Sequence, residues 1–444
     1  MAKGRKSQPV FTLIASMALG AMLTGSLAGA AGTYDPVSLN RKERRLIETS
    51  AELKTRFEQR SLLYNDEALL TLVREVGTEL APAPTDEYVE YRFFLLHDPS
   101  PNAFALPNGD IYIHTGLLAR VADRSQLAAV LSHEIAHVAA HHGIFHYRST
   151  HGANTASTLL LGESVFGRDA WWMWNDMVAV GLHTSLYGFG RAMEGEADLK
   201  AVELLMNHGY DPHALPEVLE ILSRDLEGLS PRLPTVWSDQ SGMAERAVAV
   251  WAQSAHLPGV ERDSDLFGEL LFPLRVMSIR DYIEDDYPYT ALALAQTMLE
   301  HYPRRPEVQQ LLGDGWRTLG SRSEIAPTDL SDSEKRRSAI ERVRMTRAER
   351  SEESLATPQG QAALARNLNY AIEAYGQALE LDGDFAPAYR GLGEVYELLN
   401  SPREAAAAYL NYVKLARNAP DRGIIIERLK ALRDRLQGEE DGHG

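Results

Sequence analysis

The residues best suited to chemistry lie in one short segment, His133-Glu134-Ile135-Ala136-His137, which has the pattern H-E-x-x-H. In a helix, residues four positions apart project from one face, so both imidazoles can reach the same cation. Glu134 lies beside them and can act as a base toward a water molecule without ligating the metal. The pattern predicts a zinc site, and an ordinary polar helix face is the alternative.

The residues around this motif favour the metal site. Apolar side chains recur through the segment and indicate a buried helix, and a buried His or Glu without partners would be unfavourable. A metal ion would supply the missing partner. The apolar residues are Leu127, Val130, Leu131, Ile135 and Val138.

A catalytic zinc needs a third protein ligand and an open position. His141 continues the spacing, but eight residues rise about 12 Å along a helix, which is too far for one shared ion. Glu194 is the better candidate, because Asp198 lies four residues later on the same helix face and can orient a ligand histidine. Glu196 would point to the opposite side, and we expect it to be solvated. The predicted metal ligands are His133, His137 and Glu194.

The composition limits what else the chain can do. Its 444 residues include 62 Asp and Glu against 45 Lys and Arg, which gives a net charge of -17 and argues against nucleic-acid binding. The sequence has no cysteine, which excludes disulfides, thiol catalysis and Cys-ligated metals. Any metal must therefore be held by His, Asp or Glu.

The first residues have the three-part pattern of a secretory signal peptide. A basic start is followed by the apolar run Val10 to Leu27 and then by small residues, with Ala28 and Ala30 spaced as at a cleavage site. We predict a signal peptide over residues 1–30, which in a bacterium implies a periplasmic protein; an uncleaved membrane anchor is the alternative.

The segment that follows predicts an α+β domain, mainly α, over residues 36–265. Helical periodicity runs through 36–80, and 88–96 reads as a strand. Asn108-Gly109 between two apolar stretches is a strong hairpin signal. We expect helices from Asp123 to about His142, with Asp123 and Gln126 spaced as a capping box, and from Met193 to Asn207. A Pro-punctuated helical stretch follows.

Residues 155–190 are apolar and aromatic, but charged residues interrupt them, so a transmembrane helix is not expected there. The segment could form a lid over the site or part of the core. Its large aromatic residues are Trp171, Trp172, Trp174, Tyr187 and Phe189.

The last third has the spacing of tetratricopeptide repeats. Leu312-Gly313-x-x-Trp316 recurs as Leu392-Gly393-x-x-Tyr396, and Ala371 and Tyr375 recur 34 residues later as Ala405 and Tyr409. We predict an α-helical repeat domain over 280–435. A charged insert at 321–360 is expected to be a solvated helix or linker rather than a binding patch, and 436–444 a disordered tail.

Three ordered motifs, NAFALPNGDIYIHTGLL, SHEIAHVAAHH and EGEAD, resemble the gluzincin metallopeptidase family that includes the CAAX prenyl protease. The resemblance covers about residues 60–255 and implies a zincin-like domain. It implies zinc ligation by His133, His137 and Glu194, with Glu134 as general base. It also implies a catalytic role for Asp198, described in the family as a proton donor; from the physics alone, Asp198 would hydrogen-bond a ligand histidine.

One feature departs from the family. Its periplasmic members usually carry a His-Pro pair before a downstream Glu-Arg pair, and that histidine can approach the zinc. Here Glu245-Arg246 is present, but no histidine lies between His213 and His256. A histidine latch over the metal is therefore unsupported.

Two functions remain open from the sequence. The first is a periplasmic zinc endopeptidase that degrades misfolded outer-membrane proteins and aids β-barrel assembly, with repeats that dock on the assembly machinery, as the resemblance implies. The second is a chaperone or scaffold in which the repeats bind partners and proteolysis is minor. Prenyl-protein processing would need several membrane-spanning helices, and the sequence predicts no integral membrane domain.

Overall fold

The computed structural model describes residues 37–84, 86–150, 189–228, 240–262, 265–285, 287–321 and 358–441. The predicted signal peptide lies outside these residues, as do nearly all of the aromatic segment 155–190 and of the charged insert 321–360. No helix in the described ranges is both long enough and apolar enough to span a membrane.

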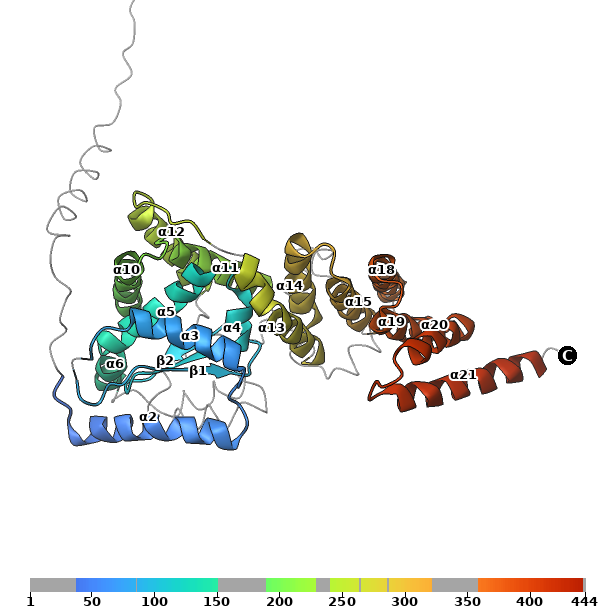
Figure 1. Ribbon diagram of the computed structural model, residues 1–444, viewed down its shortest axis with the longest axis horizontal. Helices are drawn as coiled ribbons and strands as arrows, with labels where there is room; N and C mark the ends of the chain where they lie inside the picture. Colours follow the sequence, from blue (N-terminus) through green and yellow to red (C-terminus); the bar gives the residue numbers. More distant parts are fainter. Residues whose placement is uncertain are drawn as a thin grey trace, which may run out of the picture.

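The N-terminal part packs helices around a small sheet, and the C-terminal helices extend from it as an arm (Figure 1). This confirms the predicted α+β, mainly helical class. The sheet and its nearest helices are α2 (Arg41–Gln59), α3 (Glu67–Leu80), β1 (Arg92–Leu96), β2 (Ala103–Ala105), β3 (Asp110–His114), α4 (Thr115–Arg120), α5 (Arg124–Ala139) and α6 (His142–Thr150). Three more helices complete this part: α10 (Arg191–Asn207), α11 (Ala214–Gly228) and α12 (Gln240–Ser254).

The sheet is mixed, in the order β1-β3-β2, with β1 parallel and β2 antiparallel to β3. The predicted hairpin at Asn108-Gly109 is therefore confirmed. Gly109 has a φ of 92°, and a Cβ there would lie 2.5 Å from the carbonyl oxygen of Glu90. Only glycine fits this turn without strain.

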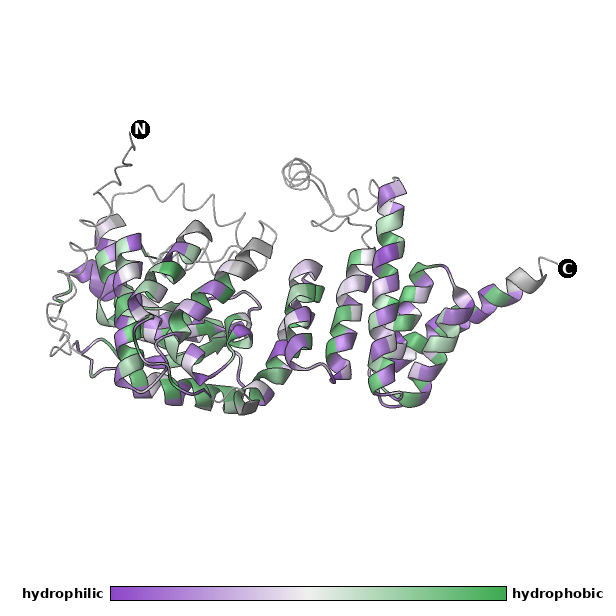
Figure 2. Cartoon of the chain, turned by 90° about the horizontal axis from the view of Figure 1, so that it is seen from above, coloured by the Kyte–Doolittle hydropathy of each residue, from purple (hydrophilic) through white to green (hydrophobic). Residues whose placement is uncertain are grey.

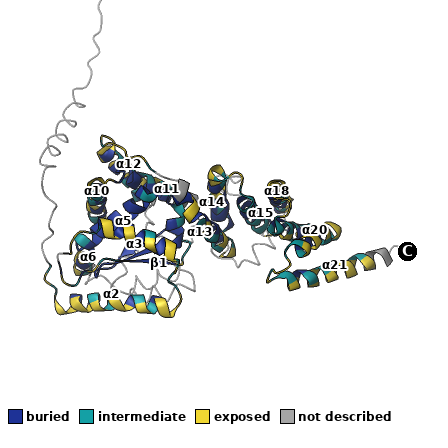
Figure 3. Cartoon of the chain, viewed as in Figure 1, coloured by how far each residue is buried: buried dark blue, intermediate teal, exposed yellow. Residues whose placement is uncertain are grey.

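The sheet lies between two layers of helices. Alternate side chains of each strand face opposite sides: Phe94 and Tyr112 pack with Leu53 and Phe57 of α2, whereas Ile111 faces a larger core. That larger core includes residues of α3, α5, α10 and α11. In Figure 3, α2 shows its exposed outer face, while the sheet and α5 are mostly buried. The helix that carries H-E-x-x-H is thus held at the centre of the fold.

Helix α5 begins as predicted and ends earlier. Asp123 is its N-cap and accepts a hydrogen bond from the N–H of Gln126, but the Gln126 side chain returns to Ala122 rather than to Asp123. The helix stops at Ala139 instead of continuing to His142. His141 has a φ of 54°, a left-handed conformation that ends a helix, and α6 then starts in a new direction.

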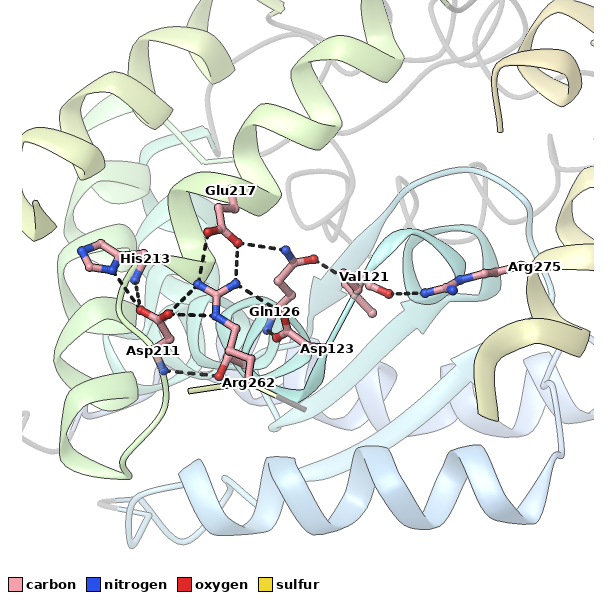
Figure 4. Close-up of polar contacts among 10 residues, drawn as sticks. Val121, Asp123, Gln126, Asp211, His213, Glu217, Arg262 and Arg275 are labelled. Atoms are coloured by element: carbon pink, nitrogen blue, oxygen red, sulfur yellow. Dashed lines mark hydrogen bonds and ion pairs between the residues drawn. The ribbon is translucent and has the colours of Figure 1, made fainter. Parts of the chain in front are cut away.

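A cluster of charges anchors the start of α5 (Figure 4). The guanidinium group of Arg262 lies 3.3 Å from Asp123, 2.7 Å from Asp211 and within hydrogen-bonding distance of Glu217. Gln126 donates to Glu217 as well, at 3.0 Å. The cluster ties the first turn of α5 to the first turn of α11 and to the segment that follows α12.

Helix α13 (Asp265–Glu284) joins the N-terminal part to the arm. Leu271 and Leu274 pack in the core of the N-terminal part, whereas Ile279 and Tyr282 pack in the first core of the arm. Arg275 donates to the carbonyl oxygen of Val121 (Figure 4). It also donates to the carbonyl oxygen of Ala119 and to the hydroxyl of Tyr302. The boundary predicted between 265 and 280 therefore lies inside one continuous helix.

The arm consists of helices that pack in sequence on their neighbours and combine hydrophobic and hydrophilic residues (Figure 2). Small residues let them approach: a Cβ on Gly313 or Gly391 would overlap the ring of Tyr375. The arrangement is consistent with helical repeats. Their assignment to the tetratricopeptide-repeat family stays a prediction. Helix α21 extends through 436–441, which the sequence predicted as tail. The helices are α14 (Pro288–His301), α15 (Pro306–Ser321), α18 (Pro358–Leu381), α19 (Ala386–Leu398), α20 (Pro402–Leu415) and α21 (Arg422–Asp441).

Candidate metal centre

Helices α5 and α10 bring the three predicted metal ligands together. His133, His137 and Glu194 are all buried, and one ligand atom from each lies within 4.8 Å of the others. The Nε2 atoms of the two histidines are 3.0 Å apart. The Glu194 carboxylate oxygens lie 3.5 Å from Nε2 of His133 and 3.8 Å from Nε2 of His137.

This donor set fits a divalent cation such as zinc. Two ligands bound at about 2.0–2.1 Å to a tetrahedral ion lie about 3.3 Å apart, close to the separation of the two Nε2 atoms. Burial and the charge of His133 keep the pKa of His137 well below its usual value. Burial also lowers the pKa of His133, but Asp198 and Glu194 outweigh it and raise that pKa to about 9. Without a metal, one proton would lie between the Nε2 atoms of His133 and His137, and a metal cation can take its place.

Asp198 lies behind His133. Its Oδ1 atom is 3.1 Å from Nδ1 of the ring, on the side away from Nε2. This placement holds the ring with Nε2 toward Glu194, which is the usual task of a carboxylate behind a ligand histidine. The geometry therefore favours an orienting role for Asp198 over a proton donor that touches substrate.

Arg246, on α12, bridges the two carboxylates of α10. It lies 2.8 Å from Glu194 and 2.7 Å from Asp198. Although burial opposes it, hydrogen bonding with His133 and the charges of His137 and Arg246 hold the pKa of Glu194 well below its ordinary value. The sequence pointed to Arg246 only as part of a Glu-Arg pair and gave it no contact, because 48 positions separate it from Asp198.

Glu134 is buried beside the ligands. Burial raises the pKa of its carboxyl group to about 7, and the backbone N–H of Ala105 in β2 donates a hydrogen bond to it. The predicted base thus lies between the ligand helix and the edge strand of the sheet.

Two residues that the sequence did not assign to the metal site lie near it. His141, rejected as a ligand on distance, faces away: its Nε2 is 3.2 Å from Asp86. Phe189, considered only as lid or core, stacks on the ring of His137 with centroids 4.3 Å apart, and its N–H donates to Glu194 at 2.8 Å. The other aromatic residues of 155–190 lie outside the described residues.

Comparison with known proteins agrees with this geometry. Residues 67–271, the segment that holds the whole cluster, match the sequence profile of peptidase family M48. The chain contains a peptidase family M48 domain. Residues 67–271 are thus identified as a metallopeptidase domain by family, and membership of family M48 implies a divalent metal, typically zinc.

The similar proteins have two different names. It is 26% identical over 229 residues to the beta-barrel assembly-enhancing protease of Escherichia coli, covering 49% of this chain and 46% of that protein. It is 28% identical over 206 residues to the mitochondrial metalloendopeptidase OMA1 of Schizosaccharomyces pombe, covering 42% and 56%. The matches thus span about half the length of each relative.

Proposed function

We propose that the M48 domain is a zinc endopeptidase in which His133, His137 and Glu194 bind one zinc ion per chain. The observation that carries the proposal is the approach of three buried ligand atoms, with both ring Nε2 atoms turned toward each other. Asp198 and Arg246 hold this arrangement from behind, so the ligands are positioned before a metal binds.

The mechanism assigns one role to each residue. Zinc would act as a Lewis acid that activates water and polarises the scissile carbonyl group. Glu134 accepts the proton of the attacking water and delivers it to the leaving amine. A carboxyl group whose pKa is near 7 suits both transfers, because it can gain and lose a proton at neutral pH.

An extended substrate could pair with β2. This strand lies at the edge of the sheet and packs against α5, so a peptide added there would pass close to Glu134. Such pairing needs free backbone groups in the substrate and would select unfolded segments. One donor of β2, the N–H of Ala105, already bonds Glu134, so pairing would involve the neighbouring groups.

The natural substrates we propose are misfolded or misassembled outer-membrane proteins in the periplasm. Similarity to a beta-barrel assembly-enhancing protease supports this proposal, together with the predicted signal peptide. The arm would dock on the β-barrel assembly machinery. The second candidate is a chaperone or scaffold with little proteolysis. The repeat-like helices of the arm support both candidates equally.

The decisive experiment compares the full chain with Glu134→Gln on an unfolded outer-membrane β-barrel protein, with zinc present. We expect cleavage by the wild type and a loss of at least about 100-fold in the variant, because the general base is removed while all three ligands remain. Zinc content, measured on both proteins, is expected to be equal.

Each other result has a distinct meaning. Equal cleavage by both proteins would contradict the role of Glu134. Bound zinc without cleavage by either protein would favour the scaffold function. Absence of bound zinc in the wild type would contradict the proposed metal centre itself.

A further inference from the structure

The two ligand histidines differ in what lies behind them. His133 has a carboxylate, Asp198, next to its Nδ1 atom. Among the residues that the structure describes, the partner of Nδ1 of His137 is an imidazole rather than a carboxylate: Nδ1 of His142 lies 2.8 Å from it. On the other side of the His142 ring, Nε2 lies 3.4 Å from Oε2 of Glu196.

The turn between α5 and α6 creates this contact. Had α5 continued, the fifth residue after His137 would have pointed to another side of the helix. The left-handed conformation of His141 instead starts α6 with His142 turned back toward His137. His142 is almost fully buried, with 2% of its surface exposed, whereas the Glu196 side chain is 53% exposed.

Only one assignment of protons satisfies all of these contacts. If Nε2 of His137 binds a metal, its Nδ1 must carry the hydrogen and donate it to Nδ1 of His142. Nε2 of His142 then carries a hydrogen and points it toward the carboxylate of Glu196. His137 therefore donates one hydrogen bond, and His142 accepts that bond and donates another to the negative charge of Glu196.

We propose that His142 and Glu196 form a positioning relay that orients His137 for metal binding. The inference rests on the proposed zinc centre and extends it. The three acidic residues of the Glu194–Asp198 segment then have separate tasks: Glu194 faces the metal, Asp198 supports one ligand histidine directly, and Glu196 supports the other through His142. His142 is not a fourth ligand, because its nearest nitrogen faces the wrong side of His137.

The test measures the zinc dissociation constant of the full chain by competition with a chelator. We expect His142→Leu to weaken zinc binding by about 10–100-fold, since the Nδ1 hydrogen of His137 loses its acceptor. His142→Asn, which keeps an acceptor oxygen near the position of Nδ1, should recover most of the loss. Glu196→Ala, at an exposed position that tolerates substitution, should weaken binding by less than about tenfold.

Two comparisons separate positioning from a general effect on folding. His114→Asn is the matched control, because His114 is also a buried histidine, but its Nδ1 atom lies 2.9 Å from the hydroxyl of Ser100 and it belongs to none of the contacts of the relay. Zinc affinity should not change in that variant. Combining Glu196→Ala with His142→Leu should weaken binding no more than His142→Leu alone, because Glu196 acts through His142.

The visible spectrum of the cobalt-substituted protein gives a second readout that does not depend on activity. We expect a shifted ligand-field spectrum in His142→Leu and an unchanged one in His114→Asn. If both His142→Leu and Glu196→Ala keep the zinc affinity and the cobalt spectrum of the wild type, the relay is overturned. The proposed metal centre would then still stand. No zinc binding by the wild type would overturn both. If His142→Leu does not fold, unchanged zinc affinity in Glu196→Ala would still contradict the relay.

Discussion

Arg246 contacts two buried carboxylates of the candidate centre, since it lies 2.8 Å from Glu194 and 2.7 Å from Asp198. Removing it would leave these two carboxylates with much less positive charge around them, chiefly that of His133. We expect Arg246→Leu to lower the free energy of unfolding of the metal-free protein by about 3–5 kcal/mol. Added zinc should recover part of this loss, because a divalent cation neutralises the same carboxylates.

Thermal unfolding with chelator and with zinc would measure both effects. Arg124→Leu is a suitable control, since Arg124 pairs with Glu75 and Glu79 at 3.7–3.8 Å on the exposed surface, where such pairs contribute about 0–1 kcal/mol. An Arg246→Leu deficit that is equal with and without zinc would argue against a shared electrostatic role.

At this scale, the sequence predicted those residues whose spacing is local. His133 and His137, or Glu194 and Asp198, are four positions apart on one helix, and helix geometry alone puts each pair on one face. The contact between α5 and α10 could also be predicted, because the two histidines of α5 need a third ligand and the acidic motif of α10 supplies one. Arg246, Phe189 and His142 were not predicted, because their contacts depend on tertiary packing or on a turn that breaks helical spacing.

The joint between α2 and α6 depends on the ionisation of one buried residue, Glu43. Glu43 closes the capping box of α2 with Asn40 and also accepts two hydrogen bonds from Arg148 of α6, at 2.9 and 3.1 Å. The hydrogen bond from Arg148 is the main reason that the pKa of Glu43 lies below its ordinary value of 4.5. Glu43 is 1% exposed.

The sign of the effect follows from that lowered pKa. The folded protein holds Glu43 ionised more strongly than the unfolded chain, so its stabilisation is complete above about pH 4.5 and is lost as pH falls through the folded-state pKa. We expect Glu43→Gln to cost about 1–3 kcal/mol at pH 7 and to have progressively less effect below pH 4.5. Urea unfolding across pH 3–7 would measure it. Glu52→Gln, at an exposed pair on the same helix, should show little change at any pH.

Elements were predicted well where one signal dominated. Asn108-Gly109 fixed the hairpin, and Asp123 marked the first turn of α5. The end of α5 was missed because nothing in Ala140-His141 is a typical helix terminator. A non-glycine residue adopts the left-handed conformation there, and contacts of His141 with Asp86 and Tyr88 hold it.

At the scale of the whole molecule, Arg275 connects the two parts. Its guanidinium group donates to two carbonyl oxygens at the end of α4, those of Ala119 and Val121, and to the hydroxyl of Tyr302 in the arm. We expect Arg275→Met to cost about 1–3 kcal/mol, because buried carbonyl groups lose their donors. The arm should also loosen relative to the peptidase part.

Calorimetry and small-angle scattering would detect these changes. In the wild type we expect one unfolding transition, whereas Arg275→Met should broaden it or split it into two and increase the radius of gyration. Arg305→Met, which removes an exposed pair with Glu269, serves as control. A single sharp transition and unchanged scattering in Arg275→Met would indicate that apolar packing along α13 is sufficient to fix the arm.

The continuity of α13 has a practical consequence for anyone who wishes to shorten the protein. The family match ends at residue 271, in the middle of this helix. Truncation there would delete Leu274 from the core of the N-terminal part, whereas truncation after residue 285 would uncover Phe272, Val276 and Ile279. Either fragment would expose apolar surface and tend to aggregate. A soluble catalytic fragment should therefore keep α14 and α15 as a cover for α13, together with α18, on which α15 packs.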